Sequence, residues 1–477
     1  MPVIAAANPP DVTVRVGPPA KLFLGNFFEF NRDRVGFLMN LAQEYGDLVP
    51  FRLGPYNAVL INHPDYIRDV LTINHTKFHK GRALARAKRL IGEGLLTSEE
   101  EFHLRQRRLM QPAFHRQRIA TYAEAMVEQA ARIRQTWQDD AVVDIRDEMT
   151  RLTLGIVCQV LLGVDVEDDA GEVGRAFSDI MELATFLLLP FSEYLEKLPL
   201  PQSLRFRRAR ARLDRIVYRI IRDRRQAGDD RGDLLSMLLA AEDTGAGTGR
   251  MSDQQVHDEC MTLFIAGHET LANALTWTWY LLSQHPAVEA RLHEEIDSAL
   301  HDRLPTLADL ARLPYTEMVL AESMRLYPPA WFLGRRTLEP YQLAGYTIPQ
   351  GSFVIMSQYV MHHDPRYYSE PNRFDPQRWT TEARASRPKF AYFPFGAGVR
   401  QCIGESFAWT EGRLILATLA QRWAMRLVPG HPVEIEPVST LRPKYGMRMV
   451  LDRRRAPRDK GAIGRERDGQ STTGGNL

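Results

Sequence analysis

The chain is poor in cysteine, with only three in 477 residues: Cys158, Cys260 and Cys402. They are odd in number and no two of them lie close together in the sequence. This excludes a disulfide framework and argues against a cysteine-based zinc site. A protein that uses no disulfide suits a reducing compartment, so we expect it to be cytoplasmic.

The sequence also lacks a long apolar run and a strong charge of either sign. Its N-terminus has no basic start followed by an apolar core, which excludes a signal peptide. The most apolar stretch, residues 186–191, is far shorter than the ~20 residues that a membrane span needs. The formal net charge is only +2. We therefore expect a soluble protein with no membrane anchor and no nucleic-acid partner.

One segment is locally basic. Apolar residues recur at helical spacing at Leu213, Ile216, Val217, Ile220 and Ile221. The rest of this predicted helix is rich in arginine between residues 205 and 225, and the aromatic residues among the arginines, Phe206 and Tyr218, are too few to form a series that stacks on bases. This pattern favours a solvated helix face over a nucleic-acid site.

Helical periodicity dominates the sequence from about residue 99 to 335, and short strands with turns follow it. We expect a mostly α fold with a smaller β portion, in a single domain over residues 21–452. A proline-rich leader is expected over 1–20 and a disordered polar tail over 453–477. An early β-hairpin is predicted from two apolar runs, Val49–Leu53 and Ala58–Ile61, that flank the turn Gly54-Pro55-Tyr56-Asn57.

The most informative segment surrounds Cys402. Glycines flank this cysteine, Arg400 lies two residues before it, and Phe395 lies seven residues before it. Glycine lets the backbone approach a ligand closely, arginine binds carboxylates, and a cysteine thiolate is an axial ligand of haem iron. A buried structural cysteine in a glycine-rich loop is the alternative at this point.

The pattern extends beyond the loop and resembles the haem-binding signature of the cytochrome P450 family, F-x-x-G-x-R-x-C-x-G-x-x-x-A-x-x-E. The matching residues are Phe395, Gly398, Arg400, Cys402, Gly404, Ala408 and Glu411. The resemblance implies the P450 fold, with haem b between a long distal helix and the cysteine loop with its proximal helix. It implies Cys402 as the iron ligand and Phe395, Arg400 and Gly404 as haem contacts.

A second motif lies within a helical run from roughly Asp253 to Gln284. Its sequence, Ala266-Gly267-His268-Glu269-Thr270, resembles the oxygen-activation motif of the family, A-G-x-[DE]-T. Threonine can bond to the i−4 carbonyl and distort a helix, so we expect a local break that opens a groove over the cofactor. By the resemblance, Ala266 contacts haem, Thr270 stabilises the oxygen, Glu269 relays protons, and His268 has no catalytic role.

Two further motifs match in order. Glu322 and Arg325 lie at i, i+3 spacing, and the resemblance joins them to Arg373 in a structural triad that holds the loop before Cys402. His103 and Arg107, four residues apart, match the family's H-x-x-x-R motif for a haem propionate. A further propionate arginine is expected at one of two neighbouring positions, Arg335 or its competitor Arg336.

The resemblance implies a monooxygenase that uses O2 and NAD(P)H to hydroxylate or epoxidise a hydrophobic small molecule. Its electrons are expected from a separate ferredoxin or flavodoxin with its reductase, and the enzyme is expected to be a monomer. The alternatives are a haem-thiolate peroxygenase or isomerase and a non-enzymatic haem sensor. Both are disfavoured because Glu269 and Thr270 are intact.

The substrate chamber is expected to be apolar. Its candidate residues come from the segment before and at the helix break and from the loop after Arg325: Met261, Leu263, Phe264, Ile265, Ala266, Ala330, Trp331, Phe332 and Leu333. Arg82 and Lys444 are the possible charged exceptions. Such a chamber suits a terpenoid, steroid, fatty acid or polyketide-like molecule, bound mainly by shape and desolvation.

Overall fold

The computed structural model of the chain describes residues 17–20, 24–163, 201–228, 230–243 and 249–454. The expected leader and tail lie almost wholly outside these ranges, as does the apolar stretch at 186–191. No helix within the described ranges is long and apolar enough to cross a membrane.

Helices make up most of the fold, as expected. The shorter ones in the first part of the chain are α1 (Phe27–Arg32), α2 (Arg34–Tyr45), α3 (Pro64–Arg68), α4 (Arg82–Ile91) and α5 (Glu100–Met110). The central ones are α6 (Arg116–Thr136), α7 (Ile145–Val157), α10 (Pro201–Ala227), α11 (Leu234–Ala240) and α12 (Asp253–Gln284). The last are α13 (Pro286–Leu300), α14 (Pro314–Leu326), α15 (Gln358–His362), α16 (Thr381–Ala385) and α17 (Glu405–Ala420).

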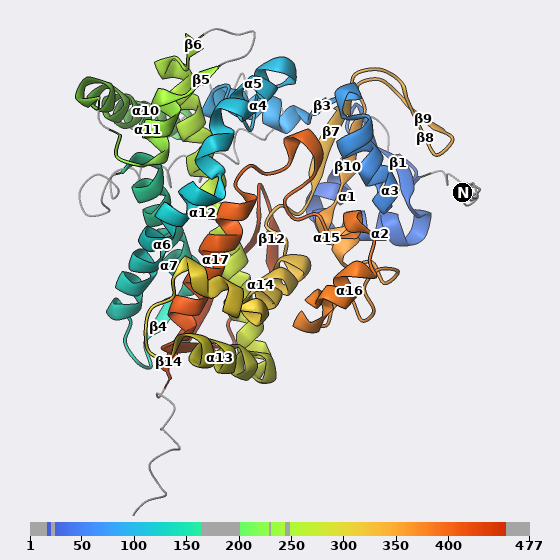
Figure 1. The fold of residues 1–477 in the computed structure, drawn as a ribbon. Helices are drawn as coiled ribbons and strands as arrows, with labels where there is room; N and C mark the ends of the chain where they lie inside the picture. The colour runs from blue at the N-terminus through green and yellow to red at the C-terminus, as the bar shows by residue number, and fades with distance from the viewer. Residues whose placement is uncertain (1–16, 21–23, 164–200, 229, 244–248, 455–477) are drawn as a thin grey trace, which may run out of the picture.

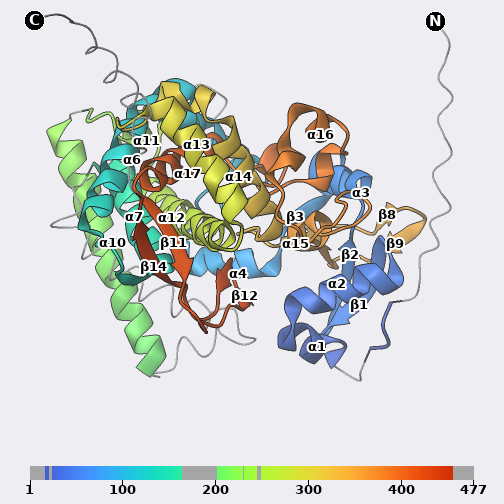
Figure 2. The ribbon, with the colours of Figure 1, turned by 90° about the horizontal axis from the view of Figure 1, so that it is seen from below.

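The main sheet lies at one side of the molecule, next to α1 and α2, while the long helices fill the other side (Figures 1 and 2). Its order is β1 (Leu48–Leu53), β2 (Tyr56–Ile61), β10 (Phe353–Met356), β7 (Leu333–Thr337) and β3 (Phe78–Lys80). The expected hairpin is confirmed as β1 and β2. Its turn is tighter than predicted, because Leu53 pairs with Tyr56 and only Gly54-Pro55 remains between the strands.

Smaller sheets complete the β portion. A three-stranded sheet has the order β11 (Trp423–Leu427), β14 (Arg448–Arg453) and β4 (Val142–Asp144). The hairpins are β5 (Glu242–Asp243) with β6 (Gly249–Arg250), β8 (Tyr341–Leu343) with β9 (Tyr346–Ile348), and β12 (Ile435–Pro437) with β13 (Leu441–Pro443). The last of these hairpins packs against α12 and is important for the site.

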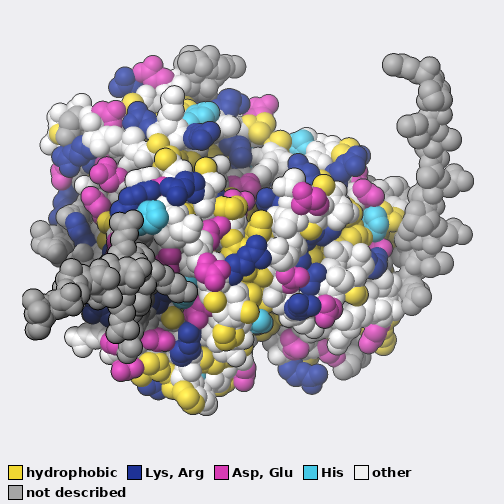
Figure 3. Space-filling model, turned by 60° about the horizontal axis from the view of Figure 1, so that its bottom comes forward, with side chains coloured by type: hydrophobic (Ala, Val, Ile, Leu, Met, Phe, Trp, Pro, Cys, Tyr) yellow, Lys and Arg dark blue, Asp and Glu magenta, His cyan; other side chains and the backbone are white. Residues whose placement is uncertain are grey.

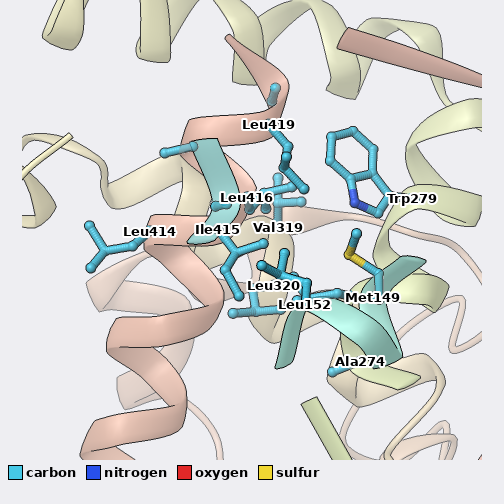
Figure 4. Packing of buried hydrophobic residues seen from close by; sticks show 14 of the residues in the cluster. Met149, Leu152, Ala274, Trp279, Val319, Leu320, Leu414, Ile415, Leu416 and Leu419 are labelled. Carbon is cyan, nitrogen blue, oxygen red and sulfur yellow. The ribbon is translucent and has the colours of Figure 1, made fainter. Parts of the chain in front are cut away.

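Helix α12 runs through the core and packs against α7, α14 and α17 (Figure 4). Two glycines allow this close packing: an added Cβ at Gly267 would meet Val157 of α7 at 2.9 Å, and one at Gly412 of α17 would meet Leu320 of α14 at 2.7 Å. Small residues at these crossings thus let the helices that carry the site pack closely together.

The expected break in α12 is wrong, because the helix is continuous from Asp253 to Gln284. Thr270 does bond to the i−4 carbonyl, donating from Oγ1 to Ala266 O at 2.7 Å. Because this bond stays within the turn that the helix already makes, it does not interrupt the helix.

The apolar stripe of α10 is buried, as predicted, and most of its described arginines are exposed. Arg224 is an exception, since it is buried in an ion pair with Asp233 at 2.6 Å. Basic and acidic side chains are interspersed on the face drawn in Figure 3. The arginine-rich face of α10 is thus mostly exposed to solvent, and Arg224 alone among its described arginines is buried.

A buried histidine connects α10 to α12. His257 of α12 lies between Asp214 of α10, 3.0 Å from Nε2, and Asp258, 3.1 Å from Nδ1. Its ring stacks on Tyr218 of α10. Burial alone would lower the pKa of His257, but the hydrogen bonds and charges of the two carboxylates outweigh it and raise the pKa.

We predict that the interaction of His257 with the carboxylates of Asp214 and Asp258 weakens as pH rises. A histidine whose folded pKa exceeds its unfolded value of ~6.5 stabilises the fold fully below that value, and the contribution is lost as pH rises through the folded pKa. His257→Asn should cost about 1–3 kcal/mol at pH 6 and less at pH 9, measured by denaturant unfolding. Equal losses at both pH values would contradict this prediction.

Candidate haem-thiolate active site

The loop before α17 presents the sulfur of Cys402. The Cys402 N–H donates to Phe395 O at 2.9 Å, which closes the loop. Gly398 has φ 71°, and a Cβ there would lie 2.1 Å from Leu71 O, so only glycine fits. The helix begins at Glu405, which places Cys402 just ahead of a helix N-terminus. The sequence thus folds locally to aim one sulfur out of a tight loop.

The sulfur faces an interior space. The Cys402 side chain is exposed, yet burial raises the pKa of its thiol to about 11, against the opposing effects of the Gly404 N–H and Arg107. On the central helix α12, Ala266 is also exposed, with Leu263 and Thr270 half-buried on the same face. Exposed surface on two interior elements is what a flat haem group would cover.

Positive charge gathers at one end of this space. Arg400 pairs with Glu99, Arg335 is buried, and strand pairing places Lys80 of β3 opposite Arg335 of β7. Burial, then the charge of Arg400, lowers the pKa of Arg335 to about 10. Burial lowers the pKa of Lys80 to about 7, with Arg400 the next cause. The crowding of three basic side chains further lowers the pKa of Lys80 and Arg335, and anions placed among them would relieve this, which fits the two propionates of haem.

His103 belongs to the same cluster. Its Nδ1 contacts Ser98 Oγ at 3.3 Å and Leu95 O at 3.2 Å, whereas its Nε2 is buried without a hydrogen-bond partner. Burial, Lys80 and Arg400 lower the pKa of this histidine to about 4. A neutral ring with an unpartnered buried nitrogen fits a ligand group in this place.

The structure distinguishes among the expected arginines. Arg335 is buried within the cluster, while Arg336 is only half-buried, on the opposite face of the strand, which favours Arg335 as the propionate residue. Arg107 does not join them: its Nη1 donates to Gln401 O at 2.6 Å. It therefore braces the cysteine loop from α5 instead of pointing to a carboxylate.

Lys80 and Glu99 are members of this cluster that the motifs did not reveal. Lys80 Nζ donates to the carbonyls of Leu95 and Ser98 at 2.8 and 2.7 Å, and its N–H donates to Glu99 at 2.6 Å. No short pattern marks either residue, because Lys80 reaches the site only through the pairing of β3 with β7. Only contacts between distant parts of the chain bring these two residues into the cluster.

The acid and the alcohol of α12 point in different directions. Thr270 bonds to its own helix, as described above, on the face that carries Ala266. Glu269 Oε1 instead accepts a hydrogen bond from Thr440 Oγ1 of the β12–β13 hairpin at 2.8 Å. His268 is buried, with Nδ1 2.6 Å from Phe264 O, which agrees with a structural position.

The expected chamber residues divide into two groups. Exposed or half-buried side chains remain candidates for the lining: Leu263, Ile265, Ala266, Ala330, Phe332 and Leu333. Three expected members are instead buried in apolar core clusters, namely Met261, Phe264 and Trp331. Their burial in the core disfavours these three as lining residues, because a helix or loop presents only one side to a chamber and the sequence alone does not show which side.

Neither expected charged exception is free. The Arg82 guanidinium lies 4.3 Å from the Tyr56 ring centroid, and Lys444 Nζ lies 2.8 Å from Glu434. Both cations therefore have partners of their own, which favours an uncharged chamber.

The structural triad differs from the prediction at its third member. Glu322 and Arg325 are fully buried and joined by two hydrogen bonds of 2.8 Å. The side chain that completes them is Arg378, whose Nε lies 3.3 Å from Glu322. Arg373 offers only its backbone carbonyl to Arg325, and its side chain pairs with Glu370 at the surface. The prediction chose the wrong arginine, because the short helix Pro376–Trp379 packs on α14 with side chains that reach Glu322, whereas the preceding turn meets Arg325 through its backbone carbonyls.

Glu100, at the start of α5, has φ 51°, a left-handed backbone that disfavours any residue except glycine. Its carboxylate contacts His79 Nε2 at 2.8 Å and is largely exposed. We predict that Glu100→Gly raises the free energy of unfolding by about 0.5–1 kcal/mol. Glu101→Gly, at the next helical position, should lower it by about 1 kcal/mol. Denaturant unfolding tests both, and destabilisation by Glu100→Gly would refute the strain argument.

Comparisons with known proteins agree with this geometry. The chain matches the family Cytochrome P450 over residues 16–449. It is 41% identical to Cyclooctatin synthase of Streptomyces melanosporofaciens, over 89% of this chain and 93% of that protein. It is 40% identical to Cyclooctat-9-en-7-ol 5-monooxygenase of the same organism, over 88% and 91%. It is 36% identical to Pentalenene oxygenase of Streptomyces avermitilis, over 92% and 97%.

Solved structures show the same fold. The cytochrome P450DA heme domain superposes with a TM-score of 0.83 at 27% identity, over 92% of this chain and 98% of that one. The retinoic acid bound cyanobacterial CYP120A1 gives a TM-score of 0.82 at 27% identity, over 93% and 100%. The family resemblance, the mostly α fold and the haem-iron cofactor expected from the sequence are thus supported, and the chain belongs to the cytochrome P450 family as a monooxygenase.

Proposed function

We propose that this P450 hydroxylates or epoxidises a terpenoid, using haem b, O2 and electrons from NAD(P)H. The observation that carries the substrate class is similarity, over about nine tenths of the chain, to three relatives whose names give terpenoid products or substrates. The half-buried apolar candidates for the chamber, among them Leu263, Phe332 and Leu333, support it. Apolar walls bind such a molecule by desolvation, at ~25 cal/mol per Å² of buried apolar surface.

Each residue of the site has a separate proposed role. Haem, when bound, supplies the oxygen chemistry through its thiolate-ligated iron. Cys402 would provide that thiolate, and Arg400, Arg335, Lys80 and His103 would hold the propionates. Thr270 carries a hydroxyl proton on the open face of α12, where it can turn from Ala266 O toward the reacting group. Glu269 stands one residue away as the acid that replaces this proton.

We also propose that a separate ferredoxin or flavodoxin delivers electrons on the Cys402 side. Phe114 lies beside Gly404 of the cysteine loop, and Arg116 and Arg118, exposed and half-exposed, follow it in the sequence. Such a basic rim suits an acidic electron-transfer protein. Turnover by the purified chain with NADPH alone would contradict this dependence.

The function is tested by titrating the haem-loaded protein with cyclic sesquiterpenes and diterpenes and then assaying hydroxylation with a ferredoxin, its reductase and NADPH. We expect a high-spin spectral shift and oxygenated product with at least one cyclic terpene. Binding restricted to small, highly charged compounds would refute the substrate class.

Thr270→Ala gives a second arm of this test. Haem content and substrate binding should be nearly unchanged, while product formed per NADPH should fall about tenfold or more and peroxide or water should take its place. An unchanged ratio would remove the proposed role of Thr270.

A further inference from the structure

Helix α12 carries two functional faces. The first is the open face already described, with Leu263, Ala266 and Thr270. The second repeats every four residues and bonds to the β12–β13 hairpin through Glu269, Asn273 and Trp277. The acid of the oxygen-activation motif thus lies on the hairpin face, while its alcohol lies on the open face.

Thr440 joins the members of the hairpin face. Its Oγ1 donates to Glu269 Oε1 at 2.8 Å and lies 3.1 Å from Asn273 Nδ2. A hydroxyl has one proton to donate. Because the amide of Asn273 donates to the hydroxyl oxygen, the hydroxyl proton is left to point at the Glu269 carboxylate. Asn273 and Thr440 are both buried, so water does not compete freely for these bonds.

The turn that carries Thr440 is fixed on two sides. Trp277 Nε1 donates to Leu441 O at 3.0 Å from α12. The loop after α14 makes two more bonds, from Leu441 N to Pro329 O at 2.9 Å and from Trp331 Nε1 to Val438 O at 3.0 Å. Thr440 therefore stands at a set position relative to Glu269, next to the loop that carries the chamber candidates Ala330 and Phe332.

We propose that Thr440 is a positioning residue for proton delivery, an inference that rests on the proposed function. Its hydroxyl, oriented by Asn273, fixes the Glu269 carboxylate on the hairpin face of α12. Glu269 takes up a proton from solvent on its second carboxylate oxygen, Oε2, and gives it to the Thr270 side from this fixed position, which restores the carboxylate. Losing a hydrogen bond to a charged group changes the population of the bonded position by roughly tenfold to a hundredfold. The carboxylate would then scatter over several rotamers and deliver protons poorly.

Four variants test the proposal in the haem-loaded protein. Thr440→Val removes the hydroxyl at nearly constant volume, and Thr440→Ser restores it. Thr278→Val is the matched control, since Thr278 is also a buried threonine and bonds only within α12, to Ala274 O at 2.7 Å. Glu269→Ala removes the carboxylate itself.

Two readouts are measured for each variant. The first is the ratio of product to NADPH across pH 6 to 9. In Thr440→Val this ratio should fall about threefold or more, and its pH dependence should match that of Glu269→Ala. Thr440→Ser and Thr278→Val should keep the wild-type profile. The second is the folding equilibrium constant from denaturant unfolding, in which a Thr440→Val and Glu269→Ala double-mutant cycle should show at least about tenfold coupling.

The proposal is overturned if Thr440→Val keeps the wild-type ratio and pH profile while Glu269→Ala changes both. It is also overturned if the double-mutant cycle shows no coupling, or if Thr278→Val lowers the ratio as much as Thr440→Val. Failure of the proposed function looks different, because the wild-type protein would then form no terpenoid product at all.

Discussion

Cys402→Ala is expected to abolish the red-shifted absorption band of the ferrous–CO form and to lower turnover by at least about a thousandfold. Cys402 is the cysteine that a glycine-framed loop leaves exposed, as Ala266 is on α12. Alanine has no donor atom for iron, and removing one member of a unit that acts together costs nearly the whole effect. The CO difference spectrum of the purified variant measures the ligand directly.

The other two cysteines are built-in controls. Cys158 and Cys260 are buried in an apolar cluster, where burial raises the thiol pKa of Cys158 to about 12 and that of Cys260 further still. Cys158→Ala and Cys260→Ala should keep the red-shifted band. If Cys402→Ala keeps the band and either control loses it, the ligand assignment is wrong.

Arg325→Leu is expected to lower the free energy of unfolding by about 3–5 kcal/mol, a large part of the total stability of a domain. Arg325 is fully buried and bonds to Glu322 and to the backbone carbonyls of His362, Pro371 and Arg373. Leucine would leave Glu322 as a buried charge without its main partner. Denaturant unfolding and the yield of haem-loaded protein measure this loss.

The same measurement decides which arginine completes the triad. Arg378→Ala should cost about 1–3 kcal/mol, because Arg378 contacts the buried carboxylate of Glu322. Arg373→Ala should stay within about 0.5 kcal/mol, as expected for a surface side chain. A larger loss from Arg373→Ala than from Arg378→Ala would contradict the structure.

Local signals predicted the elements that local chemistry determines. The bounds of α12 agree with the periodic pattern, and the hairpin at Gly54-Pro55 follows from its turn residues. The motifs also located Cys402, Glu269 and Thr270 on the elements that the structure gives them. Each of these positions depends on a spacing of a few residues, which a single sequence can show.

Tertiary contacts account for what the sequence did not show. Lys80 and Thr440 reach the site through strand pairing and hairpin docking, and neither belongs to a short motif. Met261 and Phe264 were assigned to the chamber because the orientation of α12 about its axis depends on the helices around it. The choice between Arg373 and Arg378 likewise depended on which of the two arginines turns its side chain toward Glu322, since both neighbouring turns contact α14.

Turnover under isotopically labelled dioxygen tests the central claim most directly. The haem-loaded protein, supplied with a cyclic terpene, NADPH, a ferredoxin and its reductase, is allowed to react under 18O2, and the product is analysed by mass spectrometry. We expect one 18O atom per product molecule, since a monooxygenase inserts one atom of O2 into its substrate. Product that carries only oxygen from water, or that forms equally well without O2, would contradict the account.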